Sequence, residues 1–176
     1  MHTSHGMAYL HDQGLMHCDL KSLTVLLDDL NRSKLCDFRL ARVVGYTLRT
    51  MTGGIESMLW MAPEVMIHAT YDVSADVYAW GILAWEIMSP EAELFDGVSL
   101  MELSCQAAQG KRPPLQPSWP VGVCVIMVKC WSDIVEEMPT FGEAVKKLAP
   151  LVGLKKVDLE IEEGSQEELS KSLLHD

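Results

Sequence analysis

The distribution of apolar and polar residues divides the chain into a short stretch with β-strand patterns and a longer helical part. Apolar residues at helical spacing predict a helix over residues 3–11, and Gly14 suits its C-terminal cap. Three short apolar runs predict strands, at residues 15–17, 24–27 and 34–36. The polar cluster DDLNRS separates the last two runs and predicts a hairpin. Residues 37–64 show no clear period, which predicts a loop of about 25 residues.

Helical patterns dominate the rest of the chain. The segment SADVYAWGILAWEIM is apolar on nearly every side and predicts a buried central helix, which begins at an N-cap at Ser74 and stops before Pro90. Capping boxes at residues 99–102 and 140–143 begin two further helices. Between them, the segment PSWPVGVCVIMVKCWS predicts another buried helix. The pattern therefore predicts a mainly α fold with a small β hairpin element.

We place one folded domain at residues 1–153 and an acidic C-terminal tail at residues 154–176. Hydrophobic residues make up 48% of the chain, which is too many for a disordered protein. Six carboxylates crowd residues 158–168, a pattern typical of a solvated tail. Ser165 provides an N-cap for one frayed helix within it.

Charge and cysteine content narrow the classes of function. The net charge of -11 and the pI of about 4.9 come without a basic stripe, which argues against sequence-independent nucleic-acid binding. The five cysteines form no CxxC pair and three lie in apolar runs, so we expect buried free thiols and no zinc site. The chain shows no signal-peptide pattern and no apolar run near the roughly 20 residues of a membrane span. We therefore expect a soluble, cytoplasmic protein without a nucleic-acid or membrane partner.

Two aspartates carry the candidate chemistry. Asp19 follows the first predicted strand and Asp37 follows the last one. We place both strands in one hairpin, so that the two carboxylates share an edge and can bind a divalent cation or divide the roles of metal ligand and base. Lys21 points the same way as Asp19 in an extended loop, which favours an anionic phosphate. The residues alone leave a plain surface ion pair as the alternative.

Five segments resemble protein-kinase motifs, in the family's order, over residues 7–150. HCDLKSLT resembles the catalytic loop H-R-D-L-K-x-x-N, and CDFR resembles the D-F-G motif. WMAPEV resembles the A-P-E motif, and SADVYAWGILAWEIM resembles the buried helix after it. KCWSDIVEEMPTF resembles a stretch near the end of the kinase domain. The residues in these motifs are similar to those of the tyrosine-kinase-like group of serine/threonine kinases. The resemblance implies the C-terminal lobe of the kinase fold.

The resemblance also implies roles for the matching residues. Asp19 would be the catalytic base for the substrate hydroxyl, and Lys21 would contact the transferred phosphoryl group of ATP. Asp37 would hold the Mg²⁺ that bridges the phosphates of ATP, so Mg²⁺ and ATP are the implied cofactors. Ser57 would face the protein substrate, and Asp76 would hydrogen-bond the backbone of the catalytic loop. Candidate activation-loop phosphosites, for which plain loop polarity is the alternative, are Tyr46, Thr47, Thr50 and Thr52.

Several residues depart from the kinase pattern near the metal. Thr24 stands where kinases carry asparagine, the second Mg²⁺ ligand, and its hydroxyl reaches less far than an amide. Arg39 replaces the glycine of D-F-G, so we expect it to pair with Asp37 and compete with Mg²⁺. Cys18 replaces the arginine that receives a phosphorylated activation loop, which removes this mode of control.

Two further departures concern the rest of the domain. Met138 replaces an arginine that pairs in kinases with the A-P-E glutamate, here Glu64, and the sequence names no substitute partner. Neither the glycine-rich loop nor the strand lysine of the kinase N-terminal lobe occurs in the sequence, so we expect a C-terminal lobe alone. Three interpretations stay open: a serine/threonine kinase that is inactive as this isolated chain, a pseudokinase-type module that binds protein partners, and a truncated gene product without a function of its own.

Overall fold

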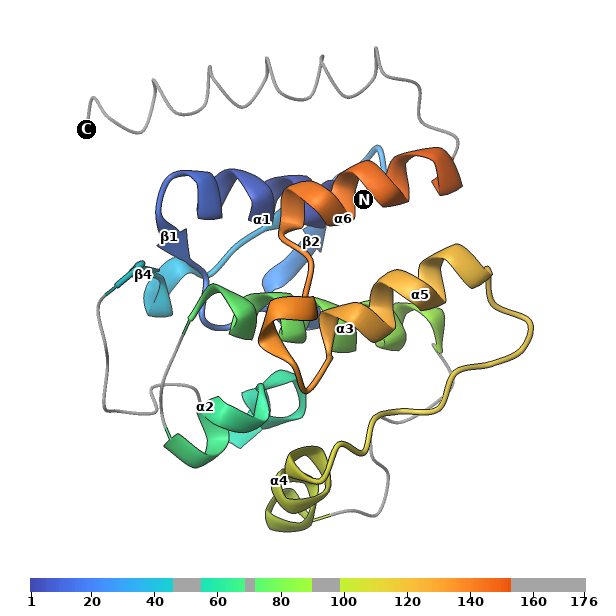
Figure 1. Cartoon of the computed structure of the whole chain (residues 1–176). Helices are drawn as coiled ribbons and strands as arrows, with labels where there is room; N and C mark the ends of the chain where they lie inside the picture. Colours follow the sequence, from blue (N-terminus) through green and yellow to red (C-terminus); the bar gives the residue numbers. More distant parts are fainter. Residues whose placement is uncertain (46–54, 69–71, 90–98, 153–176) are drawn as a thin grey trace.

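The computed structural model describes residues 1–45, 55–68, 72–89 and 99–152. The helices in these ranges are α1 (His2–Asp12), α2 (Pro63–His68), α3 (Val73–Met88), α4 (Leu100–Ala108), α5 (Val121–Cys130) and α6 (Phe141–Leu148). The strands are β1 (Leu15–Met16), β2 (Val25–Leu27), β3 (Ser33–Leu35) and β4 (Arg42–Val43). Helix α3 runs through the middle of the molecule, with α1 packed on α6 at one side and α2 near α4 at the other (Figure 1). The predicted mainly α fold is confirmed.

Helix α3 is central because nearly all of its side chains are apolar and buried. Its N-cap is Asp72, whose carboxylate accepts a hydrogen bond from the N–H of Ser74 at 3.1 Å, so the predicted N-cap at Ser74 is wrong. Gly81 lies where α3 approaches α5, because a Cβ at this position would lie only 3.0 Å from the Cβ of Cys130. The glycine therefore permits the close packing of the two helices.

Two small antiparallel sheets carry the loops of the candidate site. The predicted hairpin is confirmed, because β2 pairs with β3. Strand β1 pairs with β4, which places Leu15 opposite Val43. Strand β4 and the 3₁₀ turns at Phe38–Leu40 and Ile55–Trp60 lie in the segment predicted as a loop, so that prediction is wrong for these residues. Elements this short contain too few residues to show a period.

The two aspartates do not follow strands of one hairpin. Asp19 follows β1, which belongs to the β1–β4 sheet, whereas Asp37 follows β3 of the β2–β3 hairpin. The prediction of a shared hairpin is therefore wrong. The partner of β1 lies beyond the hairpin in the sequence, and a pairing over that distance leaves no local signal.

The predicted helix ends are mostly confirmed. Gly14 follows α1 with a φ of +70°, as its capping position requires. The side chain of Ser99 accepts from the N–H of Glu102, and Thr140 and Glu143 form the complete capping box at the start of α6. These side chains satisfy N–H groups that the helices themselves cannot.

Helix α5 is only half buried, so the prediction of a fully buried helix is wrong. One side packs into the core, with Ile126, Met127 and Cys130 at 3% exposure or less. The other side is open, with exposed fractions of 77%, 51% and 45% for Val121, Val125 and Val128. An apolar side chain on every face hides which face is buried.

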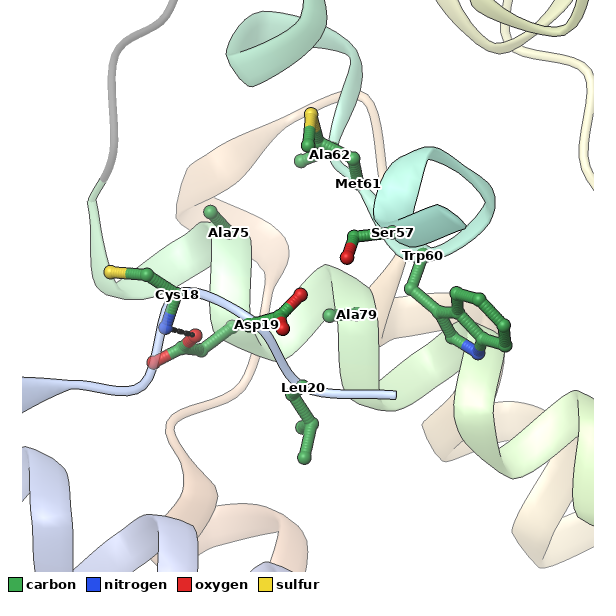
Figure 2. Close-up of a pocket in the computed structure, with 10 residues that line it drawn as sticks. Cys18, Asp19, Leu20, Ser57, Trp60, Met61, Ala62, Ala75 and Ala79 are labelled. Atoms are coloured by element: carbon green, nitrogen blue, oxygen red, sulfur yellow. Dashed lines mark hydrogen bonds between the residues drawn. The ribbon is translucent and has the colours of Figure 1, made fainter. Parts of the chain in front are cut away.

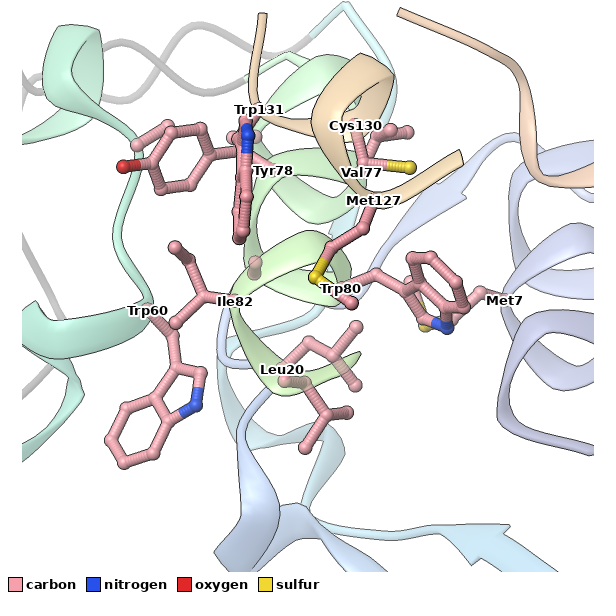
Figure 3. Packing of buried hydrophobic residues seen from close by; sticks show 14 of the residues in the cluster. Met7, Leu20, Trp60, Val77, Tyr78, Trp80, Ile82, Met127, Cys130 and Trp131 are labelled. Carbon is pink, nitrogen blue, oxygen red and sulfur yellow. The ribbon is translucent and has the colours of Figure 1, made fainter. Parts of the chain in front are cut away.

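The hydrophobic core lies between α1, α3 and α5. Figure 3 shows Met7 from α1, Trp80 and Ile82 from α3 and Met127 from α5, together with Leu20 from the loop after β1. Leu20 is 2% exposed, so this loop is inserted into the core by its own side chain.

The cysteine prediction holds in part. The five cysteines are free, and Cys18 and Cys130 are buried, but Cys105 is exposed. In the ranges described above, no helix has the length and apolarity needed to cross a bilayer. The predicted phosphosites at Tyr46, Thr47, Thr50 and Thr52 and the tail at residues 154–176 lie outside the described residues.

Candidate functional site

The loop after β1 is fixed by one buried carboxylate on α3. Asp76, at 2% exposure, accepts hydrogen bonds from the N–H groups of His17 at 2.8 Å and Cys18 at 2.9 Å. His11 of α1 pairs with the same carboxylate through Nε2 at 2.9 Å. The expectation that Asp76 bonds this loop is confirmed. Two bonds to neighbouring N–H groups hold Cys18 at a φ of +63°, a conformation that a non-glycine residue rarely adopts.

His17 joins the two loops of the site. Its ring is fully buried, and Nδ1 accepts from the N–H of Asp19 at 3.3 Å. Nε2 therefore carries the proton and donates to the carbonyl oxygen of Cys36 at 3.1 Å, the residue before Asp37. The ring also contacts Phe38, with 5.2 Å between the ring centroids. A single neutral imidazole thus sets the position of one aspartate relative to the other.

Asp19, Lys21 and Ser57 form a compact buried group. The Nζ of Lys21 lies 3.1 Å from Oδ2 of Asp19 and donates to Oγ of Ser57 at 2.7 Å. Among the described residues, Oδ1 of Asp19 has no partner although it is buried. Figure 2 shows Asp19 and Ser57 beside a small cleft of about 20 Å³, which Trp60 and Ala79 also line. A carboxylate oxygen without a partner at a cleft can accept the proton of a hydroxyl group.

Asp37 is held by Arg39 and not by the core. The guanidinium of Arg39 donates from Nε to Oδ1 and from Nη2 to Oδ2, both at 2.6 Å. The hydrogen bond from Arg39 lowers the pKa of Asp37, and the positive charge of Lys21 lowers it further. The predicted pairing of Arg39 with Asp37 is confirmed. Lys21 contacts Asp19 directly, whereas it acts on Asp37 only through its charge.

Thr24 shapes the turn of the catalytic loop. Its side chain is 1% exposed, and Oγ1 accepts from the N–H of Lys21 at 3.1 Å. The hydroxyl proton points to the carbonyl oxygens of Asp19 and Lys21, at 2.9 and 3.0 Å. This hydroxyl is therefore occupied by the backbone.

The two residues predicted to hold Mg²⁺ do not fit a metal ion in this arrangement. Both carboxylate oxygens of Asp37 accept from Arg39, and the hydroxyl of Thr24 serves the loop backbone. Within the described part of the chain, no cluster of three or more His, Cys, Asp or Glu side chains is arranged to hold a metal. A cation at Asp37 therefore requires Arg39 to move.

A sequence profile described as protein tyrosine and serine/threonine kinase matches residues 1–148. The chain belongs to this family. It is 35% identical over 144 residues to a probable serine/threonine-protein kinase of Dictyostelium discoideum, covering 81% of this chain and 16% of that protein. It is also 35% identical over 146 residues to the receptor tyrosine-protein kinase erbB-2 of Rattus norvegicus, covering 82% of this chain and 12% of the receptor. The chain thus spans less than a fifth of these relatives.

Family membership confirms the resemblance to protein kinases that the sequence motifs indicated. The matched residues include Asp19, Lys21, Asp37 and Ser57. The structure brings Asp19, Lys21 and Ser57 into contact, and it sets Asp37 apart with Arg39. Their catalytic and metal-binding roles stay predictions.

The glutamate of the A-P-E motif has lost its kinase partner. Among the described residues, Oε1 of Glu64 is buried without a hydrogen-bond partner, and Met138 packs against the core at the position of the family's arginine. The guanidinium of Arg112 has other partners, because it donates to Asp133 at 2.6 Å and to the carbonyl oxygen of Trp131 at 2.9 Å. A buried acceptor without a hydrogen-bond partner lowers the stability of the fold.

Sequence reasoning missed His11, which braces Asp76 from the opposite side. Its signal was present, because His11 lies four residues after the fully buried Met7 and therefore on the same face of α1. The ring stacks edge-on against Phe141 of α6 with 5.0 Å between centroids.

Proposed function

We propose that this chain is the C-terminal lobe of a serine/threonine-type protein kinase. Its substrate side, formed by Asp19, Lys21 and Ser57, is assembled, whereas its metal side, formed by Asp37, is closed by the pair with Arg39. On the substrate side, Asp19 accepts the proton of a protein hydroxyl group. Lys21 contacts the phosphoryl group that is transferred from ATP, and Ser57 faces the substrate. As an isolated chain, it performs no phosphoryl transfer.

The observation that carries this proposal is that Oδ1 of Asp19 is buried beside a cleft and has no hydrogen-bond partner in the described part of the chain. Lys21 binds the other oxygen of the same carboxylate, so Oδ1 is the oxygen left to accept a proton. The 2.7 Å contact of Lys21 with Ser57 supports the serine/threonine class, because the kinases of the group that the motifs resemble keep a Thr or Ser at this position.

The inactive state follows from the other half of the site. Arg39 donates hydrogen bonds to both carboxylate oxygens of Asp37. The motifs with which the kinase N-terminal lobe holds the phosphates of ATP do not occur in the 176 residues. Positioning and charge stabilisation supply nearly all of the catalysis in this reaction, so a lobe without them has almost no rate enhancement.

Metal binding tests this proposal. We expect no shift of the melting temperature of the wild-type chain with Mg-ATP or Mn-ATP. Arg39→Ala releases Asp37, so it should show Mn²⁺ binding by calorimetry, and this binding should vanish when Asp37→Asn is added. Lys34→Ala, which removes an exposed cation of the hairpin, is the matched control. A wild-type shift with Mg-ATP that disappears in Asp37→Asn would contradict the closed metal side.

A second candidate function is a protein-binding module. The hairpin exposes a cluster of leucines, with exposed fractions of 69% for Leu23, 56% for Leu26, 68% for Leu27 and 70% for Leu30. Exposed apolar side chains gathered in one short segment favour a contact with another protein, and a second copy of this chain is the partner that we propose.

Sedimentation velocity tests the leucine surface. We expect concentration-dependent association of the wild-type chain and a loss of this association in Leu26→Ser with Leu27→Ser. Val121→Ser with Val125→Ser removes an equally exposed apolar pair from α5 and serves as the control. Equal sedimentation of the wild type and the hairpin variant would argue against the module.

A further inference from the structure

A second cavity lies away from the Asp19 cleft. It has a volume of about 410 Å³ and opens between the end of α1, the start of α3 and the turn before α6. None of its lining residues lines the Asp19 cleft. The volume falls in the usual range of small-ligand sites, about 300–1,000 Å³.

The walls of this cavity combine apolar surface with two carboxylates. Ala8, Val77 and Met138 give apolar surface, and Asp12 and Asp72 contribute the charges. The described residues that line the cavity include no lysine and no arginine. His11 also lines the cavity, but its Nε2 pairs with Asp76, so the two carboxylates leave an excess of negative charge beside the apolar wall, which is complementary to an organic cation.

Asp72 can serve the cavity without giving up its role in the fold. Its Oδ1 accepts from the N–H of Ser74 at the start of α3, and Oδ2 accepts no hydrogen bond from another described residue. Asp12 is the last residue of α1 and is exposed. The C-terminus of a helix carries partial negative charge, which adds to the attraction for a cation at this end.

An anion is the alternative, because the N-termini of α3 and α6 also border the cavity. Side chains already accept from part of the N–H groups at these ends. Asp72 accepts from Ser74 at α3, and at α6 Thr140 accepts from the N–H of Glu143 while Glu143 accepts from the N–H of Thr140. The carboxylates of Asp72 and Glu143 at these same two ends would also repel an anion.

We propose that this cavity binds an organic cation, an ammonium or guanidinium group carried on a short apolar chain. The apolar chain lies against Val77 and Met138, and the cationic head lies between Asp12 and Asp72. Such a group occurs on small amines and on lysine or arginine side chains, which share this chemistry. The proposal is independent of the phosphotransfer site.

Methyl NMR on the full chain, labelled at the methionine methyl groups, tests the proposal. Pentylamine is the probe. We expect a saturable shift of the Met138 methyl group at millimolar concentration, as befits a ligand of few atoms. The methyl group of Met127, which is 0% exposed in the core, should not move. The neutral probe 1-pentanol and the anion pentanoate should bind about fivefold more weakly or not at all.

Charge-removing variants locate the cationic head. In Asp12→Asn with Asp72→Asn, the asparagine at position 72 keeps an oxygen that can cap α3. We expect pentylamine to bind about fivefold more weakly to this variant, since two ion pairs are lost. Asp29→Asn removes an exposed carboxylate from the hairpin and should leave the affinity unchanged.

Gly142 offers a test that leaves both carboxylates in place. A Cβ at Gly142 would meet nothing closer than Oγ1 of Thr140 at 4.0 Å, so a side chain fits there. Gly142→Lys supplies an internal ammonium group at the cavity and should weaken pentylamine binding more than Gly142→Gln, which has similar length without charge. Competition by a capped lysine tripeptide would identify a protein side chain as the source of the cation. Binding of the free amine alone would identify a small molecule.

Three results would overturn the proposal. The first is the absence of a saturable Met138 shift in a chain that unfolds cooperatively. The second is equal binding of pentylamine and 1-pentanol, which would remove the role of charge. The third is tighter binding of pentanoate than of pentylamine, which would make the cavity an anion site.

Discussion

The two halves of the candidate site are held in opposite ways. The catalytic loop is inserted into the core by Leu20 and braced by Asp76, which is 2% exposed. The turn that carries Asp37 is held by Arg39, whose side chain is 85% exposed. Breaking a buried pair leaves an unpaired polar group without water, whereas an exposed pair exchanges its partner for water. A substitution at Arg39 should therefore be tolerated by the fold, and one at Leu20 or Asp76 should not.

The largest effect is expected for Asp76→Ala. The substitution leaves the N–H groups of His17 and Cys18 buried without an acceptor, which should lower the free energy of unfolding by about 3–5 kcal/mol. Asp76→Asn keeps one oxygen as acceptor and should cost less. Urea unfolding followed by circular dichroism measures both, with Asp29→Ala as a surface control. A loss no larger than that of the control would show that the loop is not braced by α3.

A smaller effect concerns the thiol of Cys18. Burial raises its pKa from 9.0 to about 12, and the charge of Asp76 adds to the rise. At pH 8 the thiolate fraction of Cys18 should be about a thousandfold lower than that of a thiol with an ordinary pKa, since each unit of pKa is a factor of ten. The folded pKa lies above the unfolded value. The stabilisation by the neutral thiol is therefore complete below pH 9 and is lost as the pH rises toward 12.

Alkylation with iodoacetamide, mapped by mass spectrometry, measures this difference. Exposed Cys105 should react first and the two buried thiols, Cys18 and Cys130, last, with half-buried Cys36, next to Asp37, in between. Equal rates for Cys18 and Cys105 at pH 8 would mean that the catalytic loop opens as readily as the surface.

The smallest effect on stability is expected for Arg39→Ala. The pair that it removes is exposed, so the denaturant midpoint should not change measurably. The pKa of Asp37 should rise toward its ordinary value, because the hydrogen bond from Arg39 is the main cause of its lowering. Any stability that the pair provides is present above the unfolded pKa and lost as the pH falls through the folded pKa. Carboxyl NMR titration measures the change, and an unaltered pKa would show that Arg39 does not hold Asp37.

The parts of the fold that were predicted correctly all have local signals. The β2–β3 hairpin follows from two apolar runs around a polar turn, and the α6 cap follows from Thr140 and Glu143. The pairing of β1 with β4 has no such signal, because each strand contains two residues. Helix α5 was misjudged because its valines face both the core and the solvent.

The candidate site shows the same division. The contact of Asp19 with Lys21 and the pair of Asp37 with Arg39 join residues two positions apart, so the sequence predicts them. The contact of Lys21 with Ser57 spans 36 residues and depends on how the whole lobe packs. The position of Asp76 was predicted through family resemblance, since its bonds to His17 and Cys18 span more than 50 residues.

The long span of the Asp76 contacts also determines when the catalytic loop becomes ordered during folding. The hydrogen bond from His17 to Asp76 joins residues 59 positions apart. The chain must lose the conformational entropy of closing this segment before the N–H group of His17 can reach its acceptor. The loop therefore belongs to the last cooperative unit to form and opens only with the whole lobe. The amide protons of His17 and Cys18 should consequently exchange with deuterium only through global unfolding, whereas the N–H groups around Arg39 exchange from the native state.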